Sequence, residues 1–275
     1  METQKKVLAL HDLAAMGRAA LVPVMAALAA MGHQCVPVPT AVFSTHTGIE
    51  GFRTVDLTDW MGETLRHYAA LGLTFDAVSS GFLSSPAQVD RVCEAAERKA
   101  ADGIFLVDPV MGDNGLIYKT YTPALVQRMG ELCARADVIT PNVTEAAVLL
   151  GLAPDQSPKD PAEAANWARV LSDRYGAQVV LTGLTQDDAC VTLCYAEGVG
   201  GEVRNPRIGA YYPGTGDLFS AVLLGALLKG RRLTDAAQRA ADFVCACIAE
   251  TAAMGAEPRW GVQVETQLWR LHNDG

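Results

Sequence analysis

Short apolar runs alternate along this chain with longer stretches of helical spacing, and this alternation constrains the fold more than any other feature. The runs are apolar throughout, as expected for strands covered on both faces. Those predicted as strands are Val7–Leu10, Ala77–Gly81, Gly103–Val107, Val138–Thr140 and Val179–Leu181. Such strands, separated by helices of ~10–15 residues, are typical of βαβ units. We therefore predict an α/β fold: an open, doubly wound, mostly parallel sheet with helices on both faces.

The helical stretches between the runs begin at recognisable start signals. A proline at the first helical position follows Ser85, Thr122 and Asp160, each of which can accept a hydrogen bond as an N-cap. Gln88 and Glu163 complete the capping-box pattern in two of these stretches. The predicted helices are 19–31, 86–101, 123–134, 161–175, 216–228 and 234–253.

Two regions interrupt the alternation. Cys35–Ser44 and Val55–Leu57 are predicted as short strands separate from the main sheet. Asp188–Tyr195 and Gly201–Asn205 are predicted as an antiparallel hairpin whose turn contains Gly198, Gly200 and Gly201. About six βα units are visible, fewer than the eight of a TIM barrel. Since no linker or internal repeat divides the sequence, we predict one domain over residues 1–275.

Charge and composition exclude several classes of protein. The 22 Lys and Arg against 31 Asp and Glu give a formal net charge of −9, which lacks the basic footprint of a nucleic-acid binder. No stretch reaches ~18 apolar residues without a charge or proline, so no membrane span is expected. The apolar run near the N-terminus is too short for a signal peptide, which makes the cytoplasm the default location. The seven cysteines form no Cys-x-x-Cys pair and are expected to be free thiols.

The segment Gly214-Thr215-Gly216-Asp217 stands directly before an apolar helical run. Glycines allow neighbouring backbone N–H groups to point outward together, and a helix N-terminus favours an anion there. Asp217 would lie beside that anion, where a carboxylate is suited to take a proton from an attacking hydroxyl. The alternative is that Asp217 only caps the helix.

Two further segments place oxygen ligands after predicted strands, where open α/β sheets bind their ligands. Asp108 and Asp113 flank one turn, and Asn142 and Glu145 stand at another helix start. Hard oxygen ligands of this kind suit Mg²⁺ bound through few carboxylates, waters and phosphates. The alternative for the second segment is again a helix cap. The first strand is followed by no Gly-x-Gly-x-x-Gly and the chain has no P-loop between strand and helix, which disfavours dinucleotide enzymes and P-loop proteins.

These segments together resemble the signatures of the ribokinase-like superfamily. The matching motifs are Asp108–Asp113, Thr140–Glu145 and Gly214–Asp217, while Phe43–Gly48 and Ser80–Ser84 narrow the resemblance to the pyridoxal kinase branch. The resemblance spans about Val7 to Ala249. It implies ATP-dependent phosphorylation of the 5′-hydroxymethyl group of pyridoxal, pyridoxine or pyridoxamine, with Mg²⁺ and often a monovalent cation such as K⁺. Members of the branch are commonly homodimers.

The resemblance also implies a role for each matched residue. Asp217 would be the catalytic base, and the Gly214–Gly216 backbone, including Thr215, would bind the γ-phosphate. Asp108 and Glu145 would hold Mg²⁺, mainly through waters. The remaining implied residues contact the nucleotide phosphates (Asn142, Thr182, Thr215), fold over ATP (Asp113, Tyr118) or line the pyridine pocket (Asp12, Phe43, Thr47, Phe82).

Departures from the branch leave the preferred vitamer open. Asp12 stands where relatives usually have serine, and Phe82 where many have tyrosine. A carboxylate near a pyridine nitrogen would favour the protonated ring. Hydroxymethylpyrimidine kinase shares the fold and is the closest alternative, but its helix start frequently ends in cysteine where this chain has Asp217. A non-catalytic nucleotide-binding regulator is the second alternative, and the presence of Asp108, Glu145 and Asp217 disfavours it.

Overall fold

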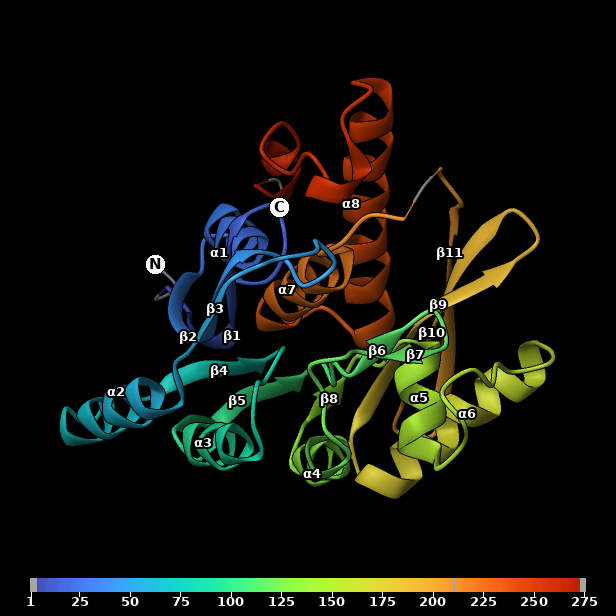
Figure 1. The fold of residues 1–275 in the computed structure, drawn as a ribbon. Coiled ribbons are helices and arrows are strands. Elements are labelled where there is room, and N and C mark those ends of the chain that lie inside the picture. The colour runs from blue at the N-terminus through green and yellow to red at the C-terminus, as the bar shows by residue number, and fades with distance from the viewer. Residues whose placement is uncertain (1–3, 210, 273–275) are drawn as a thin grey trace.

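The computed structural model describes residues 4–209 and 211–272, and it is built around one nine-stranded sheet in the order β11-β10-β9-β8-β5-β4-β1-β2-β3 (Figure 1). Pairing is parallel from β2 through β1, β4, β5 and β8 to β9, and antiparallel where β3 and the β10–β11 hairpin extend the edges. The strands are β1 (Lys6–Met16), β2 (Gln34–Thr45), β3 (Thr54–Asp56), β4 (Phe75–Ser80), β5 (Lys99–Val107), β8 (Val138–Ile139), β9 (Gln178–Gln186), β10 (Ala189–Ala196) and β11 (Val199–Pro206). A separate two-stranded sheet joins β6 (Gly112–Asp113) to β7 (Leu116–Ile117). The predicted open, mostly parallel sheet is confirmed.

Helices cover both faces of this sheet, as predicted (Figure 1). One layer contains α1 (Leu21–Ala30), α7 (Thr215–Leu228) and α8 (Leu233–Ala253). The other contains α2 (Thr58–Ala70), α3 (Pro86–Ala96), α4 (Pro123–Cys133), α5 (Val143–Leu150) and α6 (Pro161–Tyr175). Two 3₁₀ turns, η1 (Pro258–Trp260) and η2 (Leu268–Leu271), follow α8. Within the described residues, no helix combines the length and apolar character that crossing a bilayer requires.

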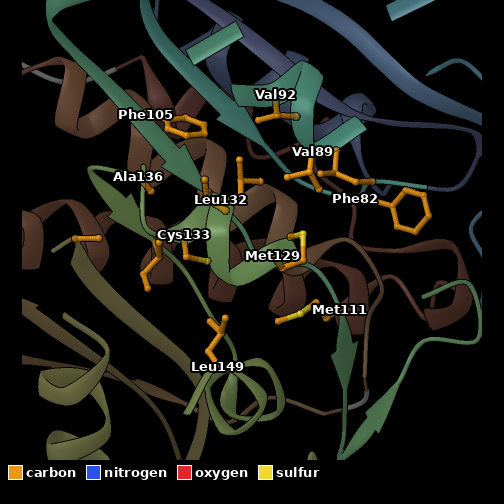
Figure 2. Packing of buried hydrophobic residues seen from close by; sticks show 14 of the residues in the cluster. Phe82, Val89, Val92, Phe105, Met111, Met129, Leu132, Cys133, Ala136 and Leu149 are labelled. Carbon is orange, nitrogen blue, oxygen red and sulfur yellow. The ribbon is translucent and has the colours of Figure 1, made fainter. Parts of the chain in front are cut away.

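Each helix layer forms its own hydrophobic core against the sheet. Along β1, Leu8 and Leu10 pack into one core and Val7 and Ala9 into the other, which explains why the strand is apolar at every position. Figure 2 shows the first core, where Phe105 of β5 lies among side chains of α3 and α4. In the second core α7 packs between the sheet, α1 and α8, and every residue from Leu218 to Ala226 is buried. The buried body of α7 holds the helix in place, while its first turn, Thr215–Asp217, stays more accessible.

The prediction that 35–44 and 55–57 lie apart from the main sheet was wrong. β2 pairs in parallel with the whole length of β1, from Lys6 opposite Gln34 to Met16 opposite Thr45. Its outer neighbour β3 is only three residues long, so much of β2 is half-exposed and its sequence is less apolar than that of an interior strand. β1 also continues past Leu10 to Met16, which places His11 and Asp12 within the strand.

The predicted helix caps, helix ends and hairpin turn were confirmed in part. Thr122 and Asp160 accept the predicted cap bonds from the N–H groups of Leu125 and Glu163. Ser85 makes no side-chain cap bond: Gln88 N donates to the carbonyl oxygen of Ser85, and Ser85 Oγ lies 3.3 Å from Thr58 Oγ1. The helix α3 ends at Ala96, five residues before the predicted end, and β5 begins at Lys99. The β10–β11 hairpin is present, but Glu197 and Gly198 form its turn, both with positive φ, while Gly200 and Gly201 belong to β11.

Candidate active site

A cleft of about 500 Å³ lies between the start of α7, the residues that follow β5 and β8, and residues 182–185 within β9. Strand ends on one edge of a parallel sheet converge, so motifs that are distant in the sequence meet here. The cleft is lined by most of the predicted site residues: Asp108, Asp113, Tyr118, Asn142, Glu145, Thr182, Gly214, Thr215, Gly216 and Asp217. The three segments singled out in the sequence therefore share one cavity.

The start of α7 has the geometry of an anion cradle. Gly214 is the N-cap residue with φ 79°, and a Cβ there would lie 2.2 Å from the carbonyl oxygen of Arg18, so the position requires glycine. The hydroxyl of Thr215 donates to the carbonyl oxygen of Tyr212 over 3.1 Å, which ties the loop to the helix. N–H groups in the first turn of a helix have no partner within the helix. Gly216 leaves space in front of them, since a Cβ there would meet only Asp108 Oδ2, at 4.0 Å.

Asp217 is held at the edge of this cradle by a distant part of the chain. Its Oδ2 accepts a hydrogen bond of 2.8 Å from the backbone N–H of Ala20, and its Oδ1 lies 3.7 Å from Nδ1 of His11. The side chain is 17% exposed. Ala20 adopts φ 57°, an unusual conformation for alanine, and this directs its N–H at the carboxylate. The carboxylate thus has a fixed position beside the place where an anion would bind.

Asp108 and Glu145 form a buried pair of carboxyl groups. Asp108 Oδ2 accepts a hydrogen bond from Ser220 Oγ over 3.0 Å, and Thr140 Oγ1 lies 3.1 Å from the same hydroxyl. Burial, followed by the charge of Asp217, raises the pKa of Asp108 to about 7. Burial, followed by the charge of Asp108, raises the pKa of Glu145 well above its usual value. The negative charges of these buried carboxylates repel one another, and a bound cation would neutralise them.

Glu145 and Asn142 also form the helix cap that the sequence left open as an alternative. Asn142 Oδ1 accepts from Glu145 N over 3.0 Å, and Glu145 Oε2 accepts from Asn142 N over 2.9 Å. Glu145 Oε1 accepts from Met111 N, and Asn142 Nδ2 donates to the carbonyl oxygen of Gly112. Carboxylate oxygens have further lone pairs, so the cap leaves Glu145 able to bind a metal-bound water.

The carboxylates of Asp108 and Glu145 fit Mg²⁺, which binds few protein ligands, better than a metal ion that is held by protein ligands alone. Among the described residues, no group of three or more His, Cys, Asp or Glu side chains is arranged to hold a metal ion. Asp108 and Glu145 alone would leave most positions around an ion to waters and substrate oxygens. Mg²⁺ is commonly bound in this way next to phosphates.

The small β6–β7 sheet stands over one side of the cleft and brings Asp113 and Tyr118 to it. Tyr211, from the segment before α7, also lines the cleft, and partial burial followed by the charge of Asp113 raises the pKa of its hydroxyl to about 12. Burial likewise raises the pKa of Tyr118. Tyr211 is a cleft residue that sequence reasoning missed, although it stands only three residues before Gly214.

The residues expected to line a pyridine pocket are not among those that line the cleft. Phe43 and Phe82 are buried and pack edge to face, with ring centroids 5.5 Å apart, and Phe82 packs in the same way on Tyr121 at 5.6 Å. Thr47 is exposed in the turn after β2. Asp12 follows His11 in β1, and Nδ1 of His11 lies 3.7 Å from Asp217 Oδ1. Burial, followed by the charge of Asp217, raises the pKa of Asp12 to about 8. The structure therefore joins Asp12 to the site, and leaves Thr47 at the surface.

Comparison with known proteins agrees with this geometry. The family described as phosphomethylpyrimidine kinase matches residues 24–260. A Bacteroides thetaiotaomicron protein, described as a candidate phosphomethylpyrimidine kinase and crystallised with pyridoxal, is 36% identical with a TM-score of 0.93, over 98% of this chain and 96% of that one. Pyridoxal kinase from Lactobacillus plantarum is 30% identical with a TM-score of 0.90, over 98% and 97% of the two chains.

Among curated relatives, pyridoxine kinase of Bacillus subtilis is 30% identical over 187 residues, which cover 66% of each chain. The match thus spans just under two thirds of that relative's length. The family match, in contrast, extends from α1 to the 3₁₀ turn after α8 and includes the motifs at 108–113, 140–145 and 214–217. The chain belongs to the phosphomethylpyrimidine kinase family and is a pyridoxal kinase-like protein of the ribokinase-like superfamily.

Proposed function

We propose that this protein transfers the γ-phosphoryl group of ATP to the 5′-hydroxymethyl group of a B6 vitamer. The observation that carries the proposal is the position of Asp217, a fixed carboxylate at the edge of the Gly214–Gly216 cradle, in the cleft that also contains Asp108 and Glu145. The names of the similar pyridoxal and pyridoxine kinases, and the pyridoxal in the Bacteroides protein, support the substrate class.

In this proposal the chain contributes positioning, charge and one base. Asp217 accepts the proton of the alcohol while the alcohol oxygen bonds to the γ-phosphorus and the bond to the oxygen of ADP breaks. The free N–H groups at the start of α7 bind the oxygens of the transferred group. Asp108 and Glu145 hold Mg²⁺, which when bound neutralises phosphate charge. Asp113 and Tyr118, on the segment over the cleft, exclude water from the reacting groups.

The family description favours a second candidate, a hydroxymethylpyrimidine or phosphomethylpyrimidine kinase. ATP consumption measured side by side with pyridoxal, pyridoxamine, pyridoxine and hydroxymethylpyrimidine separates the candidates. Activity on the pyrimidine alone would establish the alternative. Consumption with none of the four alcohols would favour a non-catalytic regulator.

The role of the base is tested by Asp217→Asn, with Asp235→Asn as the matched control, because both residues are the acid in the first turn of a long helix. We expect Asp217→Asn to keep nucleotide binding and to lose at least ~10²-fold in turnover, with no loss in the control. Near-normal turnover of Asp217→Asn would refute the role. The K⁺ requirement and the homodimer implied by the resemblance stay predictions, as does the cytoplasmic location expected from the short apolar run near the N-terminus.

A further inference from the structure

His11 lies buried directly behind the proposed base. The ring is 1% exposed, and its Nδ1 faces Asp217 Oδ1 at 3.7 Å. The other ring nitrogen, Nε2, lies 3.1 Å from the hydroxyl oxygen of Ser79 in β4. Nδ1 has no hydrogen-bond partner in the structure. A buried polar atom without a partner is uncommon, and this one faces the carboxylate on which the proposed chemistry depends.

The imidazole ring of His11 fits beside Asp217 because the neighbouring residue on β4's side is a glycine, Gly81. The backbone of Gly81 approaches so closely that a Cβ there would lie 2.2 Å from Nδ1 of His11. Ser79 and Gly81 stand at the carboxyl end of β4, next to His11 on β1. Any larger residue at position 81 would push the ring away from Asp217. The contact between His11 of β1 and Asp217 of α7 therefore depends on the glycine that directly follows β4.

We propose that His11 is a positioning residue that holds Oδ1 of Asp217 through an Nδ1–H donor. The hydroxyl of Ser79 donates to Nε2, which places the ring proton on Nδ1. Ala20 N–H already holds Oδ2, so the two donors together fix the rotation of the carboxylate and leave its remaining lone pairs to the substrate. The separation of 3.7 Å shortens to a hydrogen bond when substrates bind, as is common for catalytic contacts in unliganded enzymes.

The proposed Nδ1–H donor of His11 also offsets the repulsion between Asp217 and the carboxylates near it. Asp12 and Asp108 both lie near Asp217, whose charge contributes to raising the pKa of each. The ionised base therefore stands among acidic neighbours. Hydrogen bonds to a charged group are stronger than those between neutral groups, so the Nδ1–H donor stabilises the ionised carboxylate that accepts the proton.

Two variants of similar size separate positioning from packing. In His11→Asn the side-chain amide ends near the position of Nδ1 and can still reach Asp217, whereas in His11→Gln the amide ends near Nε2 and reaches only Ser79. We expect His11→Gln to lose about 10- to 100-fold in turnover, with KM for both substrates nearly unchanged, and His11→Asn to retain most activity. Equal losses in both variants, or no loss in either, would overturn the proposal.

The inference rests on the proposed role of Asp217, and the tests keep the two apart. If Asp217→Asn is impaired and His11→Gln is not, only the role of His11 fails; if Asp217→Asn is fully active, the proposed function fails. In the Asp217→Asn background His11→Gln should cause no further loss of turnover, because His11 acts through Asp217. Nitrogen-15 spectra should show the Nδ1–H tautomer for the signal that disappears in His11→Gln, and an Nε2–H tautomer would contradict the proposal.

Discussion

Gly214 is the position at which a single methyl group should be most damaging. With φ 79° it occupies the left-handed region, which costs an alanine about 1–2 kcal/mol. The added Cβ would also lie 2.2 Å from the carbonyl oxygen of Arg18, where ordinary contacts begin at 3.4 Å. The backbone would have to separate by about 1 Å, at an overpacking cost of about 1–3 kcal/mol. We expect Gly214→Ala to lose about 2–5 kcal/mol of unfolding free energy.

The same displacement should be visible in catalysis. The loop that would move contains Arg18 and leads directly to Ala20, whose N–H holds Asp217, so both the cradle and the base would shift. A misplacement of about 1 Å costs about 10²-fold in rate when groups must be aligned. Turnover of Gly214→Ala should fall by at least this factor, measured by ATP consumption under saturating substrates.

Gly230 supplies a matched control at the other end of the same helix. It also has φ 79°, but a Cβ there would have nothing within 4 Å. Gly230→Ala should therefore pay only the conformational cost of about 1–2 kcal/mol and keep normal turnover. Urea unfolding of both variants measures the difference. Equal losses of stability, or normal turnover in Gly214→Ala, would refute the argument from close contact.

Three further outcomes follow from the site. Glu145→Gln should raise the Mg²⁺ concentration for half-maximal activity by about 10-fold or more, and an unchanged titration would remove Glu145 from the metal site. The pKa of Asp12 is raised to about 8, so the folded state binds the proton of Asp12 more tightly than the unfolded state does. The unliganded protein should therefore lose stability as pH rises from about 4 to 8. Asp12→Asn should flatten that part of the curve of melting temperature against pH and gain at least about 1 kcal/mol at pH 8, whereas an unaltered curve would show that Asp12 does not titrate there. Ala20→Gly relieves the strained φ of 57° and should gain roughly 0.5–1 kcal/mol in urea unfolding while keeping its N–H on Asp217; a loss of stability would show that the conformation is not strained.

The sequence was sufficient for the architecture because the decisive signals are local. Apolar runs such as Gly103–Val107, and caps such as Thr122 and Asp160, depend on neighbouring residues alone. The cleft followed from a general rule, since polar residues after parallel strands must meet at one edge of the sheet. Where a signal depended on the position of a strand in the sheet, as for the half-exposed β2, the same reasoning placed it wrongly.

The rest of the site depends on contacts between residues far apart in the chain. The bond between Ala20 N and Asp217 joins positions 197 residues apart, and that between Ser220 and Asp108 spans 112. The first strand was predicted to end at Leu10, which placed His11 directly after it, but nothing in the sequence connected His11 to Asp217, 206 residues further along the chain. Likewise, Phe43 and Phe82 have the apolar character of pocket residues, and only the structure shows that both rings are buried, with Phe82 packed between Phe43 and Tyr121.

The order of the elements has a consequence for the protein as it is synthesised. All nine strands of the main sheet are complete at Pro206, whereas α7 and the Gly214–Asp217 segment come later. A nascent chain that has reached Pro206 can assemble its sheet, but of the long helices that the structure describes only α1 is then present on the apolar face that includes Val7, Ala9 and Leu106, since α7 and α8 come later. Such a surface invites aggregation until the last quarter of the chain leaves the ribosome. The last quarter of the chain therefore supplies both the remaining cover of that face and the Gly214–Asp217 residues of the cleft.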